Sequence, residues 1–223
     1  MQQLVSLLTS RGVVVSPSVR RALLTTDRGD FTHESFKKHA YEDRPLPIDY
    51  EVTISAPHMH AYALEFLRPA LKRGGKVLDI GSGSGYLCVA FMEMMEGDGH
   101  VIGVEHVPQL AQKSIENISK SHKHLLDSKK IRIIEGDGRE ALANEAPFDV
   151  IHVGAAMKSL PKSFYDQLKE NGMIMAPVGP KGGQKIILVT NLGHGNFSTE
   201  EVLDVNYVPL TSKEEQCPSL FKK

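Results

Sequence analysis

Cysteine is scarce in this sequence, since only Cys88, inside an apolar run, and Cys217, near the end, occur among 223 residues. Two isolated thiols do not make a disulfide framework, and they are typical of a reducing compartment. We therefore expect a cytoplasmic protein in which both cysteines are structural.

A surplus of either charge is also lacking, because 26 basic residues stand against 27 acidic ones and the formal net charge is -1. The basic residues form no block along the chain. Nothing in the charge pattern indicates a surface that attracts nucleic acid or an anionic membrane, so we expect neither partner.

Long apolar runs are missing too, and none reaches the roughly 20 residues that a membrane-spanning helix needs. The first residues, MQQLVSLLTSRG, lack the basic and apolar regions of a signal peptide, and their spacing of leucines and valine predicts an amphipathic helix. With 41% hydrophobic residues, the chain can bury one full core. We expect a soluble protein with a single domain over 1–223.

What the sequence does contain is an alternation of helix and strand patterns. After two predicted N-terminal helices, Pro45 and Pro47 make residues 41–52 a loop or extended arm, because proline lacks an amide donor and disfavours helix at the preceding residue. Apolar runs with strand character follow at 76–80, 100–105, 131–137, 148–154 and 173–179. Helices are expected at about 57–72, 86–95, 108–120 and 161–169. This order predicts an α/β fold, a doubly wound and mostly parallel sheet covered on both faces.

The end of the chain has a different pattern. GPKGGQ (179–184) is followed by KIILVTNL and later by EVLDVNYVPL, which indicates strands joined by turns. We therefore expect an antiparallel C-terminal edge on the sheet. The domain then divides into N-terminal helices and arm (1–55), a central core (56–180), and C-terminal strands and tail (181–223).

The strongest local motif is VLDIGSGSGY (77–86), at the turn from the first core strand into its helix. Glycines at such a turn let the backbone approach a ligand at the helix N-terminus. Three known loops lack a required residue here: Tyr86 replaces the third glycine of a dinucleotide fingerprint, neither serine fits G-x-S-x-G, and a Walker lysine is absent. The remaining interpretation is a loop for S-adenosylmethionine. Its expected cofactor-binding residues are Asp79, Gly81, Gly83, Ser84 and Gly85.

Two further acidic residues stand at the ends of predicted strands. Glu105 ends the next strand, where a carboxylate can accept hydrogen bonds from both ribose hydroxyls. Asp137, with Gly138 beside it, ends the third strand and is suitably placed for an adenine amino group. Any single carboxylate is equally explained by a solvated strand end or a helix cap, but three at successive strand ends favour S-adenosylmethionine, with S-adenosylhomocysteine as product.

The acceptor of the methyl group needs other signals. Methyltransferases acting on adenine or cytosine amino groups typically carry a D/N-P-P-aromatic motif after the fourth strand, whereas HVGAAMK (152–158) supplies no stacking aromatic. The most specific pattern is YEDRPLPIDYEVTISAPHMHAYALEFL (41–67). Together with LDIGSGSGY, EGDGR, APFDVIHVGAA, APVGP and YVPLT, it resembles the protein-L-isoaspartate O-methyltransferases through nearly the whole chain. The T-I-S-x-P-H-M motif is highly specific to that family.

This resemblance implies a repair enzyme that methylates the free carboxylate of L-isoaspartyl residues in damaged proteins and peptides. The ester would collapse to a succinimide and partly regenerate aspartate. Ser55 corresponds to the active serine of the family, the adjacent arm is expected to close over substrate and cofactor, and we expect a monomer. The cofactor contacts that the family implies are Thr53, Ile54, Ser55, His60, Ser84, Glu105, His106, Asp137, Gly138, Thr211 and Gln216.

The chain departs from the family in the arm, where Asp49 stands at a position that is commonly glycine. Glu51 and Val52 also replace residues that are often Gly, Gln or Ala.

Alternative interpretations stay open at this stage. Ser55 or Ala56, followed by Pro57, is also an ordinary helix start. His58 and His60 would face different directions on a helix and no cysteine or carboxylate cluster completes a site, so no metal is expected. Two other functions are a methyltransferase acting on a small molecule or another protein carboxyl, and an S-adenosylmethionine-binding module without catalysis.

Overall fold

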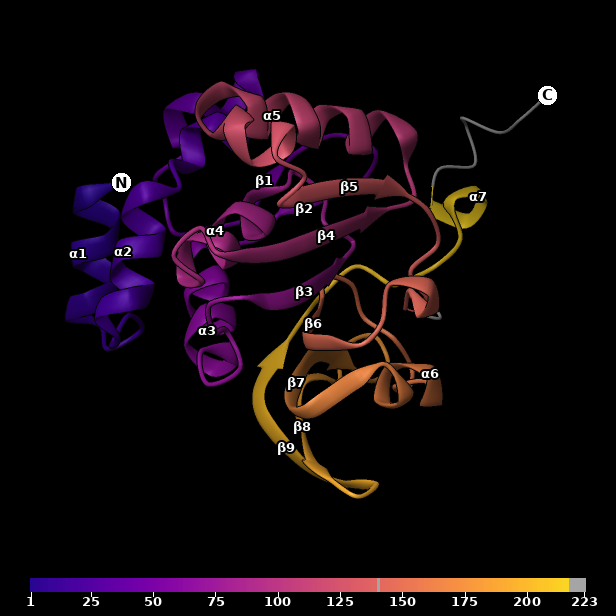
Figure 1. Cartoon of the computed structure of the whole chain (residues 1–223). Helices are drawn as coiled ribbons and strands as arrows, with labels where there is room; N and C mark the ends of the chain where they lie inside the picture. The colour runs from indigo at the N-terminus through magenta and orange to yellow at the C-terminus, as the bar shows by residue number, and fades with distance from the viewer. Residues whose placement is uncertain (140, 217–223) are drawn as a thin grey trace.

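The computed structural model describes residues 1–139 and 141–216, which form a seven-stranded sheet flanked by helices (Figure 1). The strand order is β5-β4-β3-β6-β7-β8-β9. The five parallel strands are β3 (Gly75–Ile80), β4 (Gly99–Glu105), β5 (Ile131–Glu135), β6 (Phe148–Val153) and β7 (Leu168–Val178). The antiparallel strands are β8 (Gln184–Gly193) and β9 (Asn196–Val205). The predicted doubly wound sheet with an antiparallel C-terminal edge is confirmed.

The strand order reverses between β3 and β6. The chain runs outward from β3 through β4 to β5 and then returns to place β6 on the other side of β3. Crossover helices on opposite faces therefore diverge at this point, and the carboxyl ends of β3 and β6 border a crevice.

The helices lie on both sides of this sheet. Figure 1 shows α1 and α2 beside α3 and α4, with α6 on the opposite side of the strands. The bounds are α1 (Gln2–Ser10), α2 (Pro17–Thr25), α3 (Pro57–Leu67), α4 (Tyr86–Met94), α5 (Pro108–Asp127), α6 (Lys162–Asp166) and α7 (Lys213–Gln216). Short 3₁₀ helices are η1 (Arg28–Phe31), η2 (Glu34–His39) and η3 (Ala143–Glu145).

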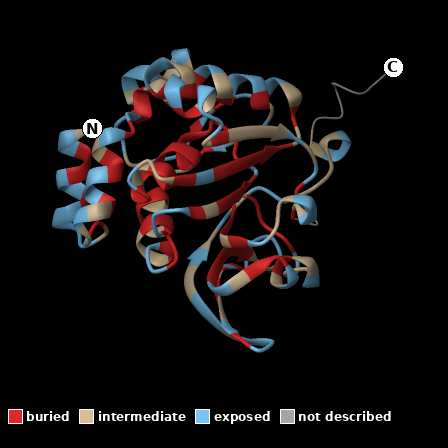
Figure 2. Ribbon diagram, in the orientation of Figure 1, coloured by how far each residue is buried: buried red, intermediate tan, exposed pale blue. Residues whose placement is uncertain are grey.

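Two apolar clusters fill the two faces of the sheet. Successive strand residues point to opposite faces, so Val77 belongs to one cluster and Leu78 to the other. Figure 2 shows the central strands buried and the exposed residues gathered on the outer surfaces of the helices and on the β8–β9 hairpin. Burial on both faces explains why the core strands read as continuous apolar runs.

Several predicted boundaries are wrong. Helix α3 ends at Leu67 because Pro69 lacks the amide that a continuing helix would need. Helix α5 extends to Asp127, beyond its predicted end near residue 120, and His122 lies buried in the added part. Helix α6 is a short segment, and β7 begins at Leu168 inside the stretch predicted as helix.

The predicted arm is a small hairpin. Strand β1 (Leu46–Pro47) pairs antiparallel with β2 (Thr53–Ile54). Between them Asp49, Tyr50 and Glu51 have φ of 77°, 52° and 59°. This left-handed conformation costs a residue other than glycine about 1–2 kcal/mol. A glycine at position 49, common in the family that the sequence resembles, would adopt it without that cost.

Candidate active site

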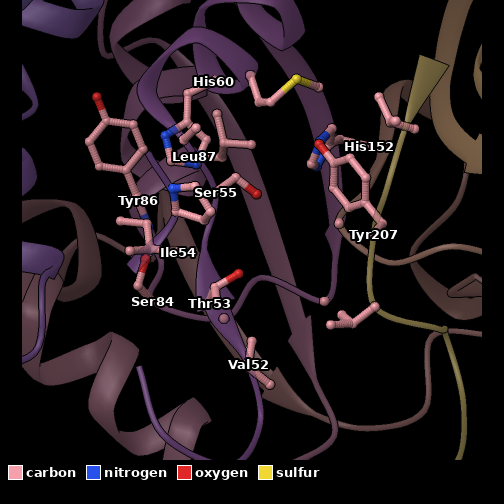
Figure 3. Close-up of a pocket in the computed structure, with 18 of the residues that line it drawn as sticks. Val52, Thr53, Ile54, Ser55, His60, Ser84, Tyr86, Leu87, His152 and Tyr207 are labelled. Atoms are coloured by element: carbon pink, nitrogen blue, oxygen red, sulfur yellow. The ribbon is translucent and has the colours of Figure 1, made fainter. Parts of the chain in front are cut away.

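The main cavity has a volume of about 390 Å³ and lies where the chain leaves β3 and β6 (Figure 3). It is bordered by the arm, the start of α3, the glycine loop, the end of β6 and the segment after β9. The predicted residues that line it are Thr53, Ile54, Ser55, His60, Asp79, Gly81, Gly83 and Ser84. The site therefore occupies the crevice where ligands of doubly wound sheets bind.

A smaller cavity of about 40 Å³ adjoins the main one, and Gly81 lines both. Its predicted lining residues are Glu105, His106, Asp137, Gly138, Thr211 and Gln216. Strand ends and the C-terminal segment, far apart in sequence, thus meet in one elongated site with two compartments.

The glycine loop owes its shape to left-handed backbone at Gly81, with φ of 69°, and at Gly85, with φ of 84°. Gly85 lines neither cavity. A Cβ there would lie 3.1 Å from the side chains of Ser114 and Ile118 on α5. Gly85 therefore permits close approach of α5, and its expected contact with a ligand stays a prediction.

Glu105 is a buried carboxylate, with 4% of its surface exposed. Its Oε2 accepts a hydrogen bond from the amide of Gly83 at 3.1 Å, and its Oε1 accepts one from the amide of Val107 at 3.0 Å. Burial raises the pKa of Glu105, and these backbone bonds oppose the shift. Each oxygen can accept a second hydrogen bond, so the carboxylate can still bind a pair of hydroxyls.

The smaller cavity is closed by contacts to the C-terminal helix. The ring Nε2 of His106 lies 2.8 Å from Oε1 of Gln216, and Nε2 of Gln216 donates to the carbonyl of Tyr50 in the arm at 3.2 Å. Hydrogen bonds from Arg139 lower the pKa of Asp137 and hold its carboxylate at the cavity wall. Helix α7, the arm and the strand ends are therefore tied together around this compartment.

Asp79 has a different environment from the one expected. Its Oδ1 lies 2.7 Å from Nδ1 of His152, and its Oδ2 accepts a hydrogen bond from the thiol of Cys88 at 3.3 Å. Both oxygens therefore contact protein groups, although Asp79 lines the main cavity. Since a carboxylate only accepts, the imidazole donates through Nδ1, and Asp79 orients His152 at the cavity wall.

Ser55 does not cap α3, because Ala56 is the N-cap residue and no side chain caps this helix. Its carbonyl accepts a hydrogen bond from Nη1 of Arg28 at 2.8 Å. Burial lowers the pKa of Arg28 to about 10, so the guanidinium remains charged near neutral pH and holds the Ser55 backbone in place. The hydroxyl of Ser55 is thereby presented to the cavity (Figure 3).

Tyr207 faces Ser55 from the segment after β9 (Figure 3). The buried side chain of Gln184 holds its backbone, accepting from the Tyr207 amide at 2.5 Å and donating to its carbonyl at 3.1 Å. Burial raises the pKa of Tyr207 to about 12, and a side-chain hydrogen bond with Ser55 opposes the shift. Tyr207 is thus a neutral phenol beside the Ser55 hydroxyl.

Sequence reasoning missed His152 and Tyr207 as site residues, although both stand in quoted motifs, HVGAA and YVPLT. For His152 the available signal was its position at the end of a predicted strand. For Tyr207 no local signal existed, because its place depends on Gln184.

His60 is buried and stacks on the ring of Tyr86, with ring centroids 4.5 Å apart. Among the residues that the structure describes, its Nδ1 has no hydrogen-bond partner. Burial lowers the pKa of His60 well below 6.5, so the ring is neutral in the folded protein. An unpartnered polar atom on a cavity residue fits a site for a polar ligand.

The neutral state of His60 predicts an acid-sensitive fold. Below pH about 6.5 the unfolded chain binds a proton at His60 that the folded chain does not, so the free energy of unfolding should fall by up to about 1.4 kcal/mol per pH unit. Urea unfolding of the wild type and His60→Asn between pH 5 and 8 would measure this. Burial also lowers the pKa of His122, so this residue would contribute to the same pH dependence. Repeating the unfolding measurements in a His122→Gln background removes its contribution. Equal pH slopes with and without His60 would contradict the prediction.

Within residues 1–139 and 141–216, no group of three or more His, Cys, Asp or Glu side chains is arranged to hold a metal ion. In the same part of the chain, no helix has both the length and the apolar character needed to cross a membrane.

Comparisons with known proteins agree on one family. The family model described as protein-L-isoaspartate(D-aspartate) O-methyltransferase matches residues 1–215. A protein-L-isoaspartate O-methyltransferase of Caenorhabditis elegans is 44% identical over 214 residues, covering 96% of this chain and 93% of the relative. Protein-L-isoaspartate O-methyltransferase 1 of Arabidopsis thaliana is 43% identical over 210 residues, covering 94% and 90%.

A solved structure agrees with these sequence matches. It is a candidate protein-L-isoaspartate O-methyltransferase of Plasmodium falciparum in complex with S-adenosyl-L-homocysteine. Its TM-score is 0.86 at 35% identity, and the match covers 94% of this chain and 97% of that one.

Proposed function

The chain belongs to the protein-L-isoaspartate(D-aspartate) O-methyltransferase family, and we propose that its cavity transfers a methyl group from S-adenosylmethionine to the free carboxylate of L-isoaspartyl residues in damaged proteins and peptides. The observation that carries the assignment of the site is the Ser55 hydroxyl at the main cavity, next to the glycine loop. Arg28 holds the Ser55 carbonyl and Tyr207 contacts the Ser55 hydroxyl, each from another part of the chain.

The residues present fit S-adenosylmethionine. A buried carboxylate that still has acceptor capacity, Glu105, suits the two hydroxyls of a ribose. Asp137 and Gly138 border the same small compartment, where an adenine would lie, and the main cavity would take the amino-acid end. When bound, the cofactor supplies an electrophilic methyl group on a positively charged sulfur.

The reaction needs little acid–base machinery from the protein. An aspartate-type carboxyl has a pKa of about 4, so the acceptor is ionised at neutral pH and no general base is required. Ser55 can donate a hydrogen bond to one carboxylate oxygen without taking a proton, and the Tyr207 hydroxyl lies beside it. The residues of this site therefore act by binding and orienting an anion.

Alignment and exclusion of water then account for the rate. Holding a weak nucleophile in line with its target can lower the barrier by up to about 7–11 kcal/mol. Opposite charges are lost when the ester forms, so a site from which water is excluded favours the less polar transition state. The β1–β2 hairpin, which carries Thr53 to the cavity and leads directly into Ser55, is suited to cover the reactants.

The test is a pair of peptides that differ only in carrying an L-isoaspartyl or an L-aspartyl residue, assayed with methyl-labelled S-adenosylmethionine. The proposal expects base-labile methyl ester on the isoaspartyl peptide and at least about 100-fold less on its partner. Cofactor binding without transfer would support the non-catalytic module instead. Equal labelling of both peptides would indicate a general carboxyl methyltransferase.

We infer one catalytic domain that acts in the cytoplasm and binds no nucleic acid, which the scarcity of cysteine and the balanced charge of the sequence support, and we propose that it is a monomer. Light scattering of the purified protein would measure its mass in solution.

A further inference from the structure

A third cavity, of about 460 Å³, lies beside the candidate active site, and we call it the flanking groove. Its walls come from the loop after β6, the turn between β7 and β8, and the segment after β9. The residues that matter here are Ala156, Met157, Lys158, Pro180, Lys181 and Tyr207.

The flanking groove is continuous with the active-site cavity. Asn206, Tyr207 and Val208 line both. They belong to the segment that leaves β9 and runs past the strand ends toward α7 (Figure 1). A polypeptide whose modified residue contacts Ser55 on one side of Tyr207 can therefore extend into the groove on the other.

Backbone hydrogen bonds hold the groove in shape. The Ala156 amide donates to the carbonyl of Val208 at 2.7 Å, and the Leu210 amide donates to the carbonyl of Ala156 at 2.7 Å. Met157 is bonded in the same way to β7, with its amide 3.0 Å from the carbonyl of Pro177. The loop that carries Lys158 is thus fixed between β7 and the segment after β9, so the groove needs no rearrangement to accept a chain.

The charge of the groove is entirely positive. Lys158 and Lys181 are exposed, and no acidic residue lines the cavity. Neither ammonium group forms an ion pair or hydrogen bond with any residue in the described part of the chain. Most other surface lysines near this edge are paired, as Lys185 is with Glu201. Two uncompensated cations over a partly apolar floor suit an acidic side chain on an extended peptide.

We propose that the flanking groove binds the residues next to the isoaspartyl residue and that Lys158 and Lys181 select substrates with aspartate or glutamate there. This inference rests on the proposed function, because it assigns a neighbouring subsite to the same substrate. Lys158 follows Ala156 by two residues, so it lies within roughly 7 Å of the contact with Val208 along the chain. An acidic residue one to three positions from the modified residue is therefore within reach.

The test compares isoaspartyl peptides that carry Glu, Gln or Lys at positions one to three on either side, with the full-length protein. For the wild type, KM for the best-placed Glu peptide should be about three- to tenfold below that of the Gln peptide, because exposed charge pairs are individually weak. The preference should shrink as salt rises from 0.05 to 0.5 M. In the double variant Lys158→Gln/Lys181→Gln the Glu and Gln peptides should differ by less than about twofold.

The matched control is Lys72→Gln/Lys123→Gln, which removes the same net charge from surfaces outside the groove and should keep the wild-type preference. A Glu preference that is absent in the wild type, or that survives in the groove double variant, overturns the proposal. Failure of the proposed function looks different, because no peptide would then be methylated. Fluorescence anisotropy of labelled Glu and Gln peptides would still report whether the groove discriminates.

Discussion

Replacing Ser55 with alanine is expected to lower kcat by about 10- to 100-fold. The hydroxyl is expected to donate to a carboxylate, and a hydrogen bond to a charged group contributes about 1.5–3 kcal/mol. The Kd of S-adenosylhomocysteine should change by less than about threefold, because Glu105 and the other residues of the smaller cavity, which would hold the ribose and adenine, are unchanged in this variant. Single-turnover methylation of an isoaspartyl peptide and calorimetric binding of the product would measure the two quantities separately.

Two variants control for loss of structure at Ser55. Ser55→Thr keeps a hydroxyl and should recover part of the rate. Tyr207→Phe removes the neighbouring hydroxyl without truncating the ring, and should lower kcat less than Ser55→Ala, because the Ser55 hydroxyl remains. If Ser55→Ala weakened product binding and turnover by the same factor, Ser55 would be a purely structural residue.

Replacing Glu105 with alanine should greatly weaken binding of S-adenosylhomocysteine and change kcat only a little. Two charge-assisted hydrogen bonds to a ribose contribute about 3–6 kcal/mol together, so the Kd of S-adenosylhomocysteine should rise by at least about 100-fold. At saturating cofactor kcat should stay within about fivefold of the wild type, because Glu105 belongs to the smaller cavity and Ser55 to the main one.

Part of the affinity lost in Glu105→Ala is expected to come from a disturbed glycine loop, since Glu105 also accepts hydrogen bonds from the amides of Gly83 and Val107. Glu105→Gln keeps one acceptor oxygen and separates the two contributions, with an expected loss of about tenfold. Asp137→Asn tests the adenine end of the site. It should raise the Kd of S-adenosylhomocysteine less than Glu105→Ala does, because the Asp137 carboxylate is paired with Arg139 and half exposed. A Kd for Glu105→Ala within threefold of the wild type would remove this carboxylate from the cofactor site.

Much of the fold was predictable because its signals are local. Apolar runs, helix composition and glycine turns each extend over a few residues, so the alternation of strands and helices could be seen without three-dimensional information. The errors in prediction fell at the ends of helices, where continuing the helix and ending it differ little in free energy. The early end of α3 could have been predicted, because Pro69 lacks the amide that a continuing helix needs. The extension of α5 past His122 depends on burial against the rest of the protein, which the sequence does not show.

The candidate site was predictable to the extent that its residues stand at strand ends. Glu105 and Asp137 were expected together because carboxyl ends of parallel strands meet at one edge, and they line the same cavity. Asp79 was assigned to the ligand, yet it contacts His152 and Cys88. The sequence could not show this, because Asp79 and His152 become partners only through the register of β3 with β6.

By itself, the sequence determined the fold class, the glycine loop, the acidic strand ends and the family motif around Ser55, since each depends on neighbouring residues. Only the tertiary structure decided that Arg28 holds Ser55, that Gln184 holds Tyr207 and that two lysines face a groove beside the site. The physical reason is sequence separation: Arg28 and Ser55 are 27 positions apart, and Gln184 and Tyr207 are 23 apart. The geometry of such contacts depends on strand order and packing, which no local pattern specifies.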